Sequence, residues 1–403
     1  MSGAPILVPD FETATLGFLV FLIGALITRR VKVLRDFNIP EPVTGGLLAA
    51  ALTLCLFLLL NRPIEFDLRI RDYFLIVFFS GIGLNARLAD LIRGGKPLLI
   101  LLGLTIVLLL LQNILGILTA LVFGQPFQIG ILLGSVSLVG GHGTTIAWAP
   151  EITRITGIAG VQELGIATAT IGLIIGALIG GPLARLLIER GNLMPNQPEA
   201  APAAGLAFDK EKSVAITPVD LMRTMFVLHL AIIIGLALHD LIQAAGLRLP
   251  AFVPCMLVSI VLGNLLPVVA PTMPSVPRSP TLSLITDFAL GTFLAMSLMS
   301  MQLWTLAGMG TMVVVSLVLQ TALAIAFTLF AVYRLMGRDY FAAVLAAGYA
   351  GFSVGATPTA IANMNAVTKR YGPSPLAFVI LPLITAFFVD LANAAAIQLF
   401  LSF

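Results

Sequence analysis

Long apolar runs dominate the pattern of hydrophobic and polar positions along this chain. A helix that crosses a bilayer needs about 20 mostly apolar residues. Ten runs approach or exceed that length, at about residues 11–28, 43–60, 73–92, 98–123, 165–188, 219–243, 250–270, 282–301, 308–333 and 376–401. The pattern therefore predicts an all-α polytopic membrane protein.

Two further apolar segments are broken in the middle by small and polar residues. The first contains "GGHGTTIAWA" at 140–149, and the second contains "SVGATPTAIA" at 353–362. Pro358 has no N–H to donate and would break a continuous helix. Irregular backbone at membrane depth is tolerated only where protein or water surrounds it. We therefore expect two re-entrant hairpins, at about 128–157 and 341–372.

The chain divides into two halves that resemble each other. A Pro- and Ala-rich polar stretch, 189–218, is predicted to be a flexible linker between residues 1–188 and 219–403. "IPEPVTGGLLAALTL" in the first half matches "LPAFVPCMLVSIVLG" in the second, and the two broken motifs occupy matching places. Internal repeats of this size are typical of secondary transporters.

The basic residues decide how the segments cross the membrane, because cytoplasmic loops collect Lys and Arg. If both broken segments are re-entrant and the N-terminus is outside, 17 of the 22 basic residues lie inside, leaving Arg62, Arg69, Arg71, Arg154 and Arg248 outside. If both cross fully, the count is 11 on each side. The bias predicts two inverted repeats of five spans each, a cytoplasmic linker and periplasmic termini.

Composition supports a membrane protein and excludes several other classes. Hydrophobic residues make up 59% of the 403 residues and charged residues 10%, with a mean hydropathy of +1.06. The net charge of +3 comes from scattered basic residues, so it gives no nucleic-acid footprint. Cys55 and Cys255 both lie in apolar runs and suit neither a disulfide framework nor a metal site. The charges around the first run have the reverse order of a signal peptide.

The broken motifs supply the chemistry expected of a substrate site. Helix N-termini and unpaired N–H groups bind anions, and glycine lets a ligand approach the backbone closely. No Lys or Arg lies deep within a span, so an anionic substrate has to be held by helix ends and neutral donors. The predicted substrate-binding residues are Gln112, Asn113, Ser137, Gly140, Gly141, His142, Gly143, Thr144, Thr145, Gly355, Ala356 and Thr357. For Gln112 and Asn113 an interhelical hydrogen bond is an equal alternative, and His142 could instead cap a carbonyl.

Freed carbonyls, hydroxyls and buried carboxylates can hold a small cation. The predicted sodium ligands are Ser353, Thr357, Thr359, Asn363, Asp390 and Asn393. Glu163, at the start of the span after the first broken motif, is a further candidate for binding an ammonium group. Sodium is the expected coupling ion, and no other cofactor is indicated. Gly172, Gly176 and Gly180, spaced by four, are predicted to serve helix packing.

Several of these stretches resemble the bacterial sodium/glutamate symporters. They are "IPEPVTGGLL", "GLNARLADLIRGG", "QNILG", "GGHGTTIAWAPE", "GALIGGPLARLL" and "AAVLAAGYAGFSVGATPTAIANMNAVTKRYGPSPLAF". The resemblance covers nearly the whole chain except its first dozen residues and the linker. It implies sodium-coupled uptake of L-glutamate across the bacterial inner membrane. It also implies a ten-helix fold with two re-entrant loops, working as an elevator-type homodimer.

Three other functions remain open from the residues alone. A transporter for citrate or another dicarboxylate would use the same tips, and the ammonium of glutamate favours an acidic partner such as Glu163 or Asp390. A membrane-embedded hydrolase needs a nucleophile and a base, for which His142 beside Thr144 is the one candidate pair. A channel could also be lined by broken hairpins, but it needs no inverted repeat.

Overall fold

The computed structural model describes residues 4–36, 39–86, 95–195, 216–244, 249–269, 275–306 and 308–402. The first half contains β1 (Ile6–Val8), α1 (Asp10–Arg30), α2 (Lys32–Asp36), α3 (Glu41–Leu60), β2 (Ile64–Phe66), α4 (Arg69–Asn85), α6 (Gly95–Val122), α7 (Phe127–Ile131), the π-helical turn η1 (Leu132–Val136), α8 (Gly141–Thr156) and α9 (Val161–Gly191). Most of residues 189–218, the predicted linker, fall outside the described residues.

The second half contains α10 (Pro218–Ala244), α11 (Phe252–Val269), α12 (Pro280–Met299), the short 3-10 helix η2 (Leu303–Leu306), α13 (Gly310–Phe327), η3 (Thr328–Val332), α14 (Tyr333–Leu335), α15 (Tyr340–Val354), α16 (Thr357–Tyr371), α17 (Pro375–Leu383), η4 (Ile384–Phe388) and α18 (Val389–Leu401). η3 and η4 are π-helical turns that join consecutive helices.

Eight helices among the described residues are long and apolar enough to cross a membrane, which confirms most of the predicted spans. They are α1, α3, α6, α9, α10, α11, α12 and the continuous run Gly310–Leu335. The predicted span at 73–92 corresponds to α4, which ends at Asn85, and residues 87–94 lie outside the described part. The predicted span at 376–401 is divided by η4 into α17 and α18. The chain is thus a multi-pass membrane protein.

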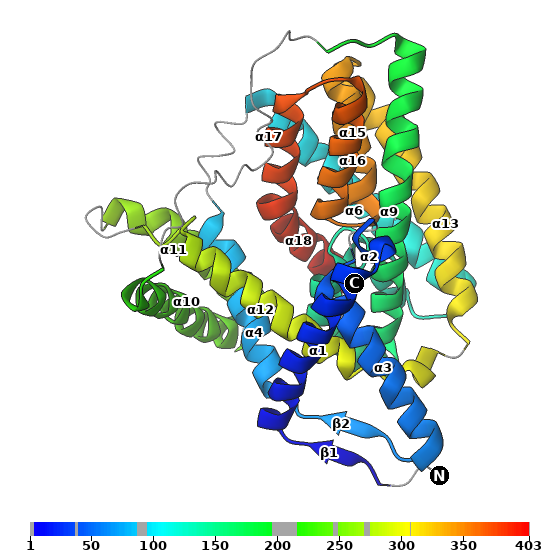
Figure 1. Ribbon diagram of the computed structural model, residues 1–403. Helices are drawn as coiled ribbons and strands as arrows, with labels where there is room; N and C mark the ends of the chain where they lie inside the picture. The colour runs from blue at the N-terminus through cyan, green and yellow to red at the C-terminus, as the bar shows by residue number, and fades with distance from the viewer. Residues whose placement is uncertain are drawn as a thin grey trace.

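One small sheet departs from the all-α prediction. β1 and β2 pair in parallel, with Ile6 opposite Ile64 and Val8 opposite Phe66. The strands lie at the end of the molecule from which α1 begins and to which α3 returns (Figure 1). Their three-residue length gives no hydrophobic periodicity, which explains why the pattern did not predict them.

The helices form two groups (Figure 1). The first group contains α1, α3 and α4 of the first half with α10, α11 and α12 of the second. Its pairings mirror each other, because α1 packs on α3 and α12 whereas α10 packs on α11 and α4. α1 and α3 approach closely: a Cβ at Gly24 would lie 2.0 Å from the Glu41 carbonyl oxygen, and one at Gly45 2.0 Å from that of Val20.

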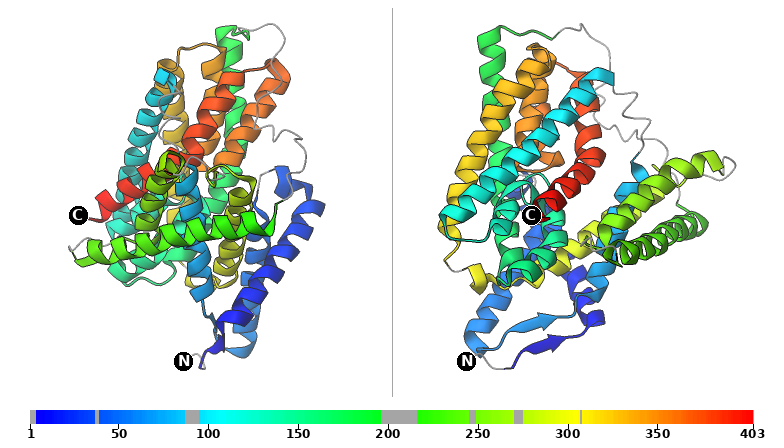
Figure 2. Two further views of the ribbon diagram at one scale, coloured as in Figure 1. Left: turned by 90° about the vertical axis from the view of Figure 1, so that its left-hand side faces the viewer. Right: turned by 180° about the vertical axis from the view of Figure 1, so that it is seen from behind.

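The second group contains α6 to α9 and α13 to α18, and it carries both broken motifs. The motifs lie in two helix pairs, which we name the first hairpin (127–156) and the second hairpin (340–371). In both views of Figure 2 the second hairpin, in orange, lies in the upper part of the molecule and the first, in sea-green, in the lower part. α9 runs beside both of them.

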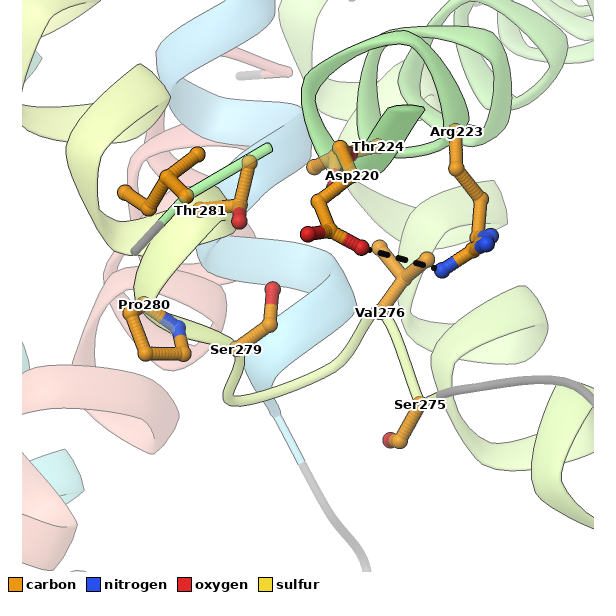
Figure 3. A pocket seen from close by; sticks show the side chains of 9 residues that line it. Asp220, Arg223, Thr224, Ser275, Val276, Ser279, Pro280 and Thr281 are labelled. Carbon is orange, nitrogen blue, oxygen red and sulfur yellow. Dashed lines mark hydrogen bonds and ion pairs between the residues drawn. The ribbon is translucent and has the colours of Figure 1, made fainter. Parts of the chain in front are cut away.

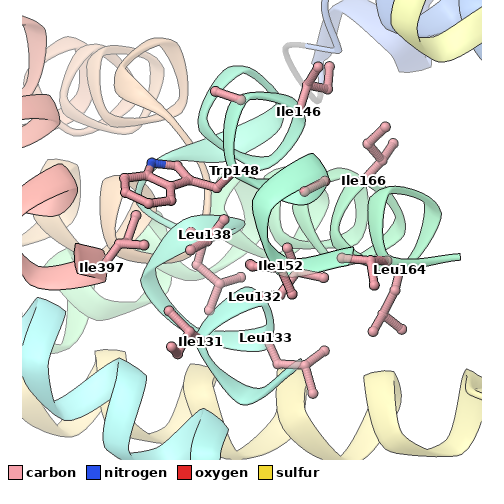
Figure 4. Close-up of a cluster of buried hydrophobic side chains, with 14 of the residues drawn as sticks. Ile131, Leu132, Leu133, Leu138, Ile146, Trp148, Ile152, Leu164, Ile166 and Ile397 are labelled. Carbon is pink, nitrogen blue, oxygen red and sulfur yellow. The ribbon is translucent and has the colours of Figure 1, made fainter. Parts of the chain in front are cut away.

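Apolar side chains hold the first hairpin against its neighbours. Its two arms meet α9 and α18 in one buried cluster (Figure 4), formed by Ile131, Leu132, Leu133, Leu138, Ile146, Trp148, Ile152, Leu164, Ile166 and Ile397. Burying such side chains stabilises the fold by about 1.5–3 kcal/mol each where water is the alternative. These apolar contacts hold the polar backbone of the tip in a fixed position.

Candidate functional site

The first hairpin is broken over residues 134–141. Gly134 has φ −104° and ψ −129°, which is not helical, and it lies inside the π-helical turn η1. Gly141, at the start of α8, has φ +65°, a conformation that glycine adopts without strain. The glycines therefore allow the chain to change direction before α8.

Hydroxyl groups stabilise this turn. Thr145 Oγ1 donates to the Gly141 carbonyl oxygen at 2.8 Å and lies 3.1 Å from Ser137 Oγ. His142 Nε2 lies 2.9 Å from Thr170 Oγ1 on α9. Ser137 and Thr145 are fully buried, and His142 is 7% exposed. These side chains thus fix the tip itself and its distance from α9.

The three glycines of "GGHG" have different surroundings. A Cβ at Gly140 would lie 2.5 Å from Thr144 Cβ, so this glycine is needed for close packing. A Cβ at Gly141 would have no atom within 4 Å, and one at Gly143 would make ordinary contact with the Phe293 ring at 3.5 Å. The backbone at Gly141 is therefore the part of the tip most open to a ligand.

The second hairpin is broken at Gly355 and Ala356. Ala356 is extended and precedes the first turn of α16, and its N–H donates to Thr359 Oγ1 at 2.9 Å. Thr359 Oγ1 in turn donates to the Gly351 carbonyl oxygen at 3.2 Å, which ties the two arms together. Thr357 is half-buried, and its Oγ1 lies 3.5 Å from the Thr385 carbonyl oxygen.

The two breaks meet at the middle of α9. A Cβ at Gly172 would lie 2.3 Å from the Val354 carbonyl oxygen and 3.1 Å from Leu138 Cδ2, so residues beside each break touch the same glycine. α8 and α16 both begin at these breaks. Two helix N-termini, each with a partial positive charge and free N–H groups, thus lie at neighbouring places in the fold.

The predicted sodium ligands fall into two places. Ser353, Thr359 and Asn363 belong to the second hairpin, and Asn363 Nδ2 donates to the Gly176 carbonyl oxygen at 2.8 Å. Asn393 instead reaches the first hairpin, since its Nδ2 donates to the Ser135 carbonyl oxygen at 3.2 Å. Asp390 lies one turn before Asn393 on α18 and is partly exposed.

Three other candidate residues form hydrogen bonds with the backbone of neighbouring elements. Gln112 and Asn113 form interhelical hydrogen bonds: Gln112 Nε2 donates to the Ser353 carbonyl oxygen at 2.7 Å, and Asn113 Oδ1 accepts from the Ser135 N–H at 3.0 Å. Glu163 Oε1 accepts from the Gln302 N–H at 2.8 Å. Glu163 precedes Gly172 by nine residues, or ~13 Å of helix, so it does not lie with the tips.

The structure adds a residue to which the sequence assigned no role. Gln320 on α13 is fully buried, and its Nε2 donates to the carbonyl oxygens of Gln112 at 2.8 Å and Leu133 at 3.3 Å. Gln112 of the first half therefore binds the second hairpin, whereas Gln320 of the second half binds the first. The sequence did contain a sign of this role, because Gln320 is an amide residue in the middle of an apolar run and lies at the position of the second half that matches Gln112.

A pocket of about 160 Å³ lies in the other helix group, where α10 and α12 begin (Figure 3). Asp220 and Arg223 line it and form an ion pair at 3.3 Å, with Ser279 and Thr281 opposite. Ser279 caps α12 by accepting from the Leu282 N–H at 3.1 Å. This pocket has no residue in common with the hairpin tips.

Comparison with known proteins agrees with the resemblance found in the sequence. The chain is 40% identical over 394 residues to the sodium/glutamate symporter of Haemophilus influenzae, covering 96% of each chain. It is 38% identical over 387 residues to the protein of that name in Escherichia coli, covering 95% of each. Among solved structures, a sodium proton antiporter from Methanocaldococcus jannaschii aligns over 97% of each chain with a TM-score of 0.38 and 15% identity.

The family assignment rests on most of the chain. The sodium/glutamate symporter family matches residues 7–373, a range that includes the first helix group, both broken motifs and the second group up to α16. Its members are transporters and not enzymes. With two relatives near 40% identity over almost their full length, this chain belongs to the sodium/glutamate symporter family.

Proposed function

We propose that the protein couples the uptake of L-glutamate to the entry of sodium ions by alternating access. The observation that carries the proposal is the meeting of two broken hairpins beside Gly172, within a chain of this family. Two helix N-termini at one place suit the two carboxylates of glutamate. The relatives in Haemophilus influenzae and Escherichia coli bear the name of a sodium/glutamate symporter.

The substrate is held mainly by backbone and neutral groups. The open backbone at Gly141 and Gly143 supplies N–H groups for carboxylates, and so does the start of α16 at Thr357. The Ala356 N–H is already donated to Thr359 Oγ1, so Ala356 lines this site without offering its own N–H. The first tip is lined and stiffened by Ser137, His142, Thr144 and Thr145. This arrangement needs no buried Lys or Arg, in keeping with the sequence.

Sodium is held by oxygen atoms of the second hairpin. Ser353, Thr357 and Thr359 offer hydroxyl oxygens whose hydrogens already point to carbonyl groups, so lone pairs face away from those bonds. Thr359 Oγ1 keeps one lone pair for a cation, since the other accepts from the Ala356 N–H. Asn363 adds an amide, and Asp390 approaches from α18, whereas Asn393 of the same helix binds the first hairpin. Sodium also offsets the negative charge that the side-chain carboxylate and the α-carboxylate of glutamate bring to the site.

Glutamate is favoured over citrate because it carries an ammonium group. Glu163 already accepts from the Gln302 backbone, away from the tips. Asp390 is a carboxylate on the same helix face as Asn393, which contacts the first hairpin. We propose that the Asp390 carboxylate is the acidic partner of the glutamate ammonium group. Citrate has no ammonium group, so a citrate transporter needs no such partner.

The hairpins are proposed to be re-entrant and the halves to be inverted repeats. Tyr340 Oη, at the start of α15, donates to the Gly372 carbonyl oxygen, just after α16, so the second hairpin begins and ends at one place. Each arm has 15 residues, or ~22 Å, against a hydrocarbon core of ~30 Å. The mirrored pairings of the first group support the inversion.

The transport step is proposed to be a movement of the hairpin-bearing group against the other. Both hairpins belong to one group, which meets the other where α8 packs on α12 and η4 on α4. Such a movement exposes the tips to each side in turn. In the expected homodimer the first group provides the fixed part.

Uptake into proteoliposomes tests the proposal. Purified protein should accumulate labelled glutamate under an inward sodium gradient, with saturation, and a potassium gradient should give none. Excess unlabelled citrate should leave the uptake unchanged. Equal uptake in potassium, or competition by citrate as strong as by glutamate, would exclude the proposed function. Flux that never saturates would indicate a channel.

A further inference from the structure

Five neutral polar side chains are buried together where α6, α13 and α18 pass the broken arm of the first hairpin. We name Gln112, Asn113, Ser135, Gln320 and Asn393 the amide cluster. All five are fully buried. They come from four different elements, α6, η1, α13 and α18, so no local pattern places them together.

The nitrogen ends of three amides are fixed by backbone carbonyl groups. Gln112 Nε2 donates to Ser353, Gln320 Nε2 to Gln112, and Asn393 Nδ2 to Ser135, at 2.7, 2.8 and 3.2 Å. An amide held at its nitrogen has a fixed carbonyl direction. The oxygen ends of these side chains are therefore oriented before any ligand arrives.

The oxygen ends are left without partners. Gln112 Oε1, Gln320 Oε1, Asn393 Oδ1 and Ser135 Oγ have no hydrogen-bond partner among the described residues, and Asn113 Nδ2 is the one unpaired nitrogen of the cluster. A buried polar group without a partner destabilises the fold, because it has lost its hydrogen bonds to water. Three amide oxygens and one hydroxyl oxygen can accept, whereas only the Asn113 amide and the Ser135 hydroxyl can donate, so acceptors outnumber donors in the cluster.

A monovalent cation would correct that imbalance. Amide and hydroxyl oxygens replace the hydration shell of alkali ions without adding charge. Calcium sites, by contrast, are built largely on carboxylates, and the cluster contains none. The chemistry of these oxygens thus selects a sodium ion rather than a divalent metal or the anionic substrate.

We propose that the amide cluster binds a sodium ion, in addition to the ion at the tip of the second hairpin. The inference rests on the proposed function and assigns Gln112 to the cation rather than to glutamate. Ser135 belongs to the first hairpin, and Gln112 binds Ser353 of the second. An ion in the cluster therefore joins both hairpins, which gives sodium a direct influence on the distance between the tips.

Sodium titration of the purified protein without glutamate tests this site. Thermal stability and bound ²²Na are measured at constant ionic strength, with choline as the replacing cation. Gln320→Met, which removes the oxygen at similar length, should lose one bound ion per protomer and raise the half-saturating sodium concentration of that ion at least tenfold. Gln320→Glu keeps an oxygen and adds charge, so its half-saturating concentration should fall.

Two further variants keep the test independent of folding defects. Asn393→Leu should reproduce the loss if Gln320→Met does not purify as a folded protein. Ser259→Ala removes an equally buried hydroxyl from α11, in the other helix group, and should leave sodium binding unchanged.

The outcomes separate this site from the proposed function. Folded Gln320→Met with unchanged sodium affinity and stoichiometry would show that the cluster is a water-bridged network only. If the wild-type protein nevertheless transports glutamate with sodium, the proposed function stands and only the site is wrong. Absence of sodium-driven uptake by the wild type would reject the function itself.

Discussion

At the scale of single residues, the hydroxyl groups of Thr357 and Thr359 have different structural roles although they belong to one motif. Thr359 Oγ1 accepts from the Ala356 N–H and donates to the Gly351 carbonyl, so it caps α16 and joins the arms of the second hairpin. Thr357 has one long contact, to Thr385 at 3.5 Å. Replacing Thr359 therefore disturbs the hairpin, whereas replacing Thr357 changes little besides the oxygen offered to a ligand.

Thr357→Ala should weaken sodium binding with little effect on folding. Loss of one oxygen ligand leaves neighbouring groups unpaired, at about 1–3 kcal/mol. The sodium concentration for half-maximal glutamate uptake should rise by the corresponding factor, about five- to 150-fold. Thr357→Ser, which keeps the hydroxyl, is the control. An unchanged sodium dependence in Thr357→Ala would place the cation site away from this residue, with Asp390 and Asn393 on α18 the next candidates.

At the scale of elements, α9 serves as the surface on which the second hairpin packs. Gly172, Gly176 and Gly180 face it, and a Cβ at Gly176 would lie 2.6 Å from the Gly351 carbonyl oxygen. The sequence predicted this packing from the spacing of four. The tip glycine Gly141 differs, because nothing lies within 4 Å of its Cβ position and its φ is +65°.

Substitutions at these two glycines should have opposite effects. Gly176→Ala forces α9 away from α15, and overpacking of this kind costs about 1–3 kcal/mol, so its melting temperature should fall while folded protein still binds glutamate. Gly141→Val meets no neighbour and adds a strain of about 1–2 kcal/mol. It should abolish glutamate binding in protein that still inserts and purifies intact, because the side chain covers the N–H groups of the tip.

Binding of labelled glutamate to size-selected, folded protein distinguishes the two effects. Gly143→Val is expected to behave like Gly141→Val, since its Cβ position makes only ordinary contacts. If both tip variants bind glutamate normally and merely melt earlier, the glycines serve packing and the proposed tip is wrong.

At the scale of the whole molecule, the distribution of basic residues predicts the orientation in the membrane. The re-entrant arrangement places 17 of 22 Lys and Arg residues on one side. The cytoplasm collects such residues, so the linker is expected inside and both termini in the periplasm. The two hairpins would then enter from opposite sides, in agreement with their separate places in Figure 2.

Cysteine labelling should confirm that orientation. In a variant without Cys55 and Cys255, a cysteine at position 200 should resist an impermeant maleimide added to intact cells and react after permeabilisation. A cysteine at position 5, before α1, should react in both conditions and serves as the positive control. Labelling of position 200 from the periplasmic side would overturn the inverted-repeat arrangement.

The sequence alone determined the class of protein, most of its helices and the two broken segments. Length and hydropathy are local properties, and a helix in lipid must satisfy its own backbone, so the apolar runs translate directly into α1, α3, α6 and α9 to α13. Glycine and proline act within a few residues, which is why the breaks near Gly141 and Pro358 could be predicted. The stretches that resemble the sodium/glutamate symporters could also be recognised from the sequence alone.

The tertiary structure alone decided which side chains share a place. Asn393, predicted as a sodium ligand beside Asp390, donates to the Ser135 carbonyl oxygen of the first hairpin, a contact that the sequence did not indicate. Glu163, close in sequence to the first motif, points to Gln302 instead, and Gln320 meets Gln112 from more than 200 residues away. Such contacts depend on how helices of the two halves cross. The relevant distances are set by packing between elements, on which the local pattern of polar and apolar residues carries no information.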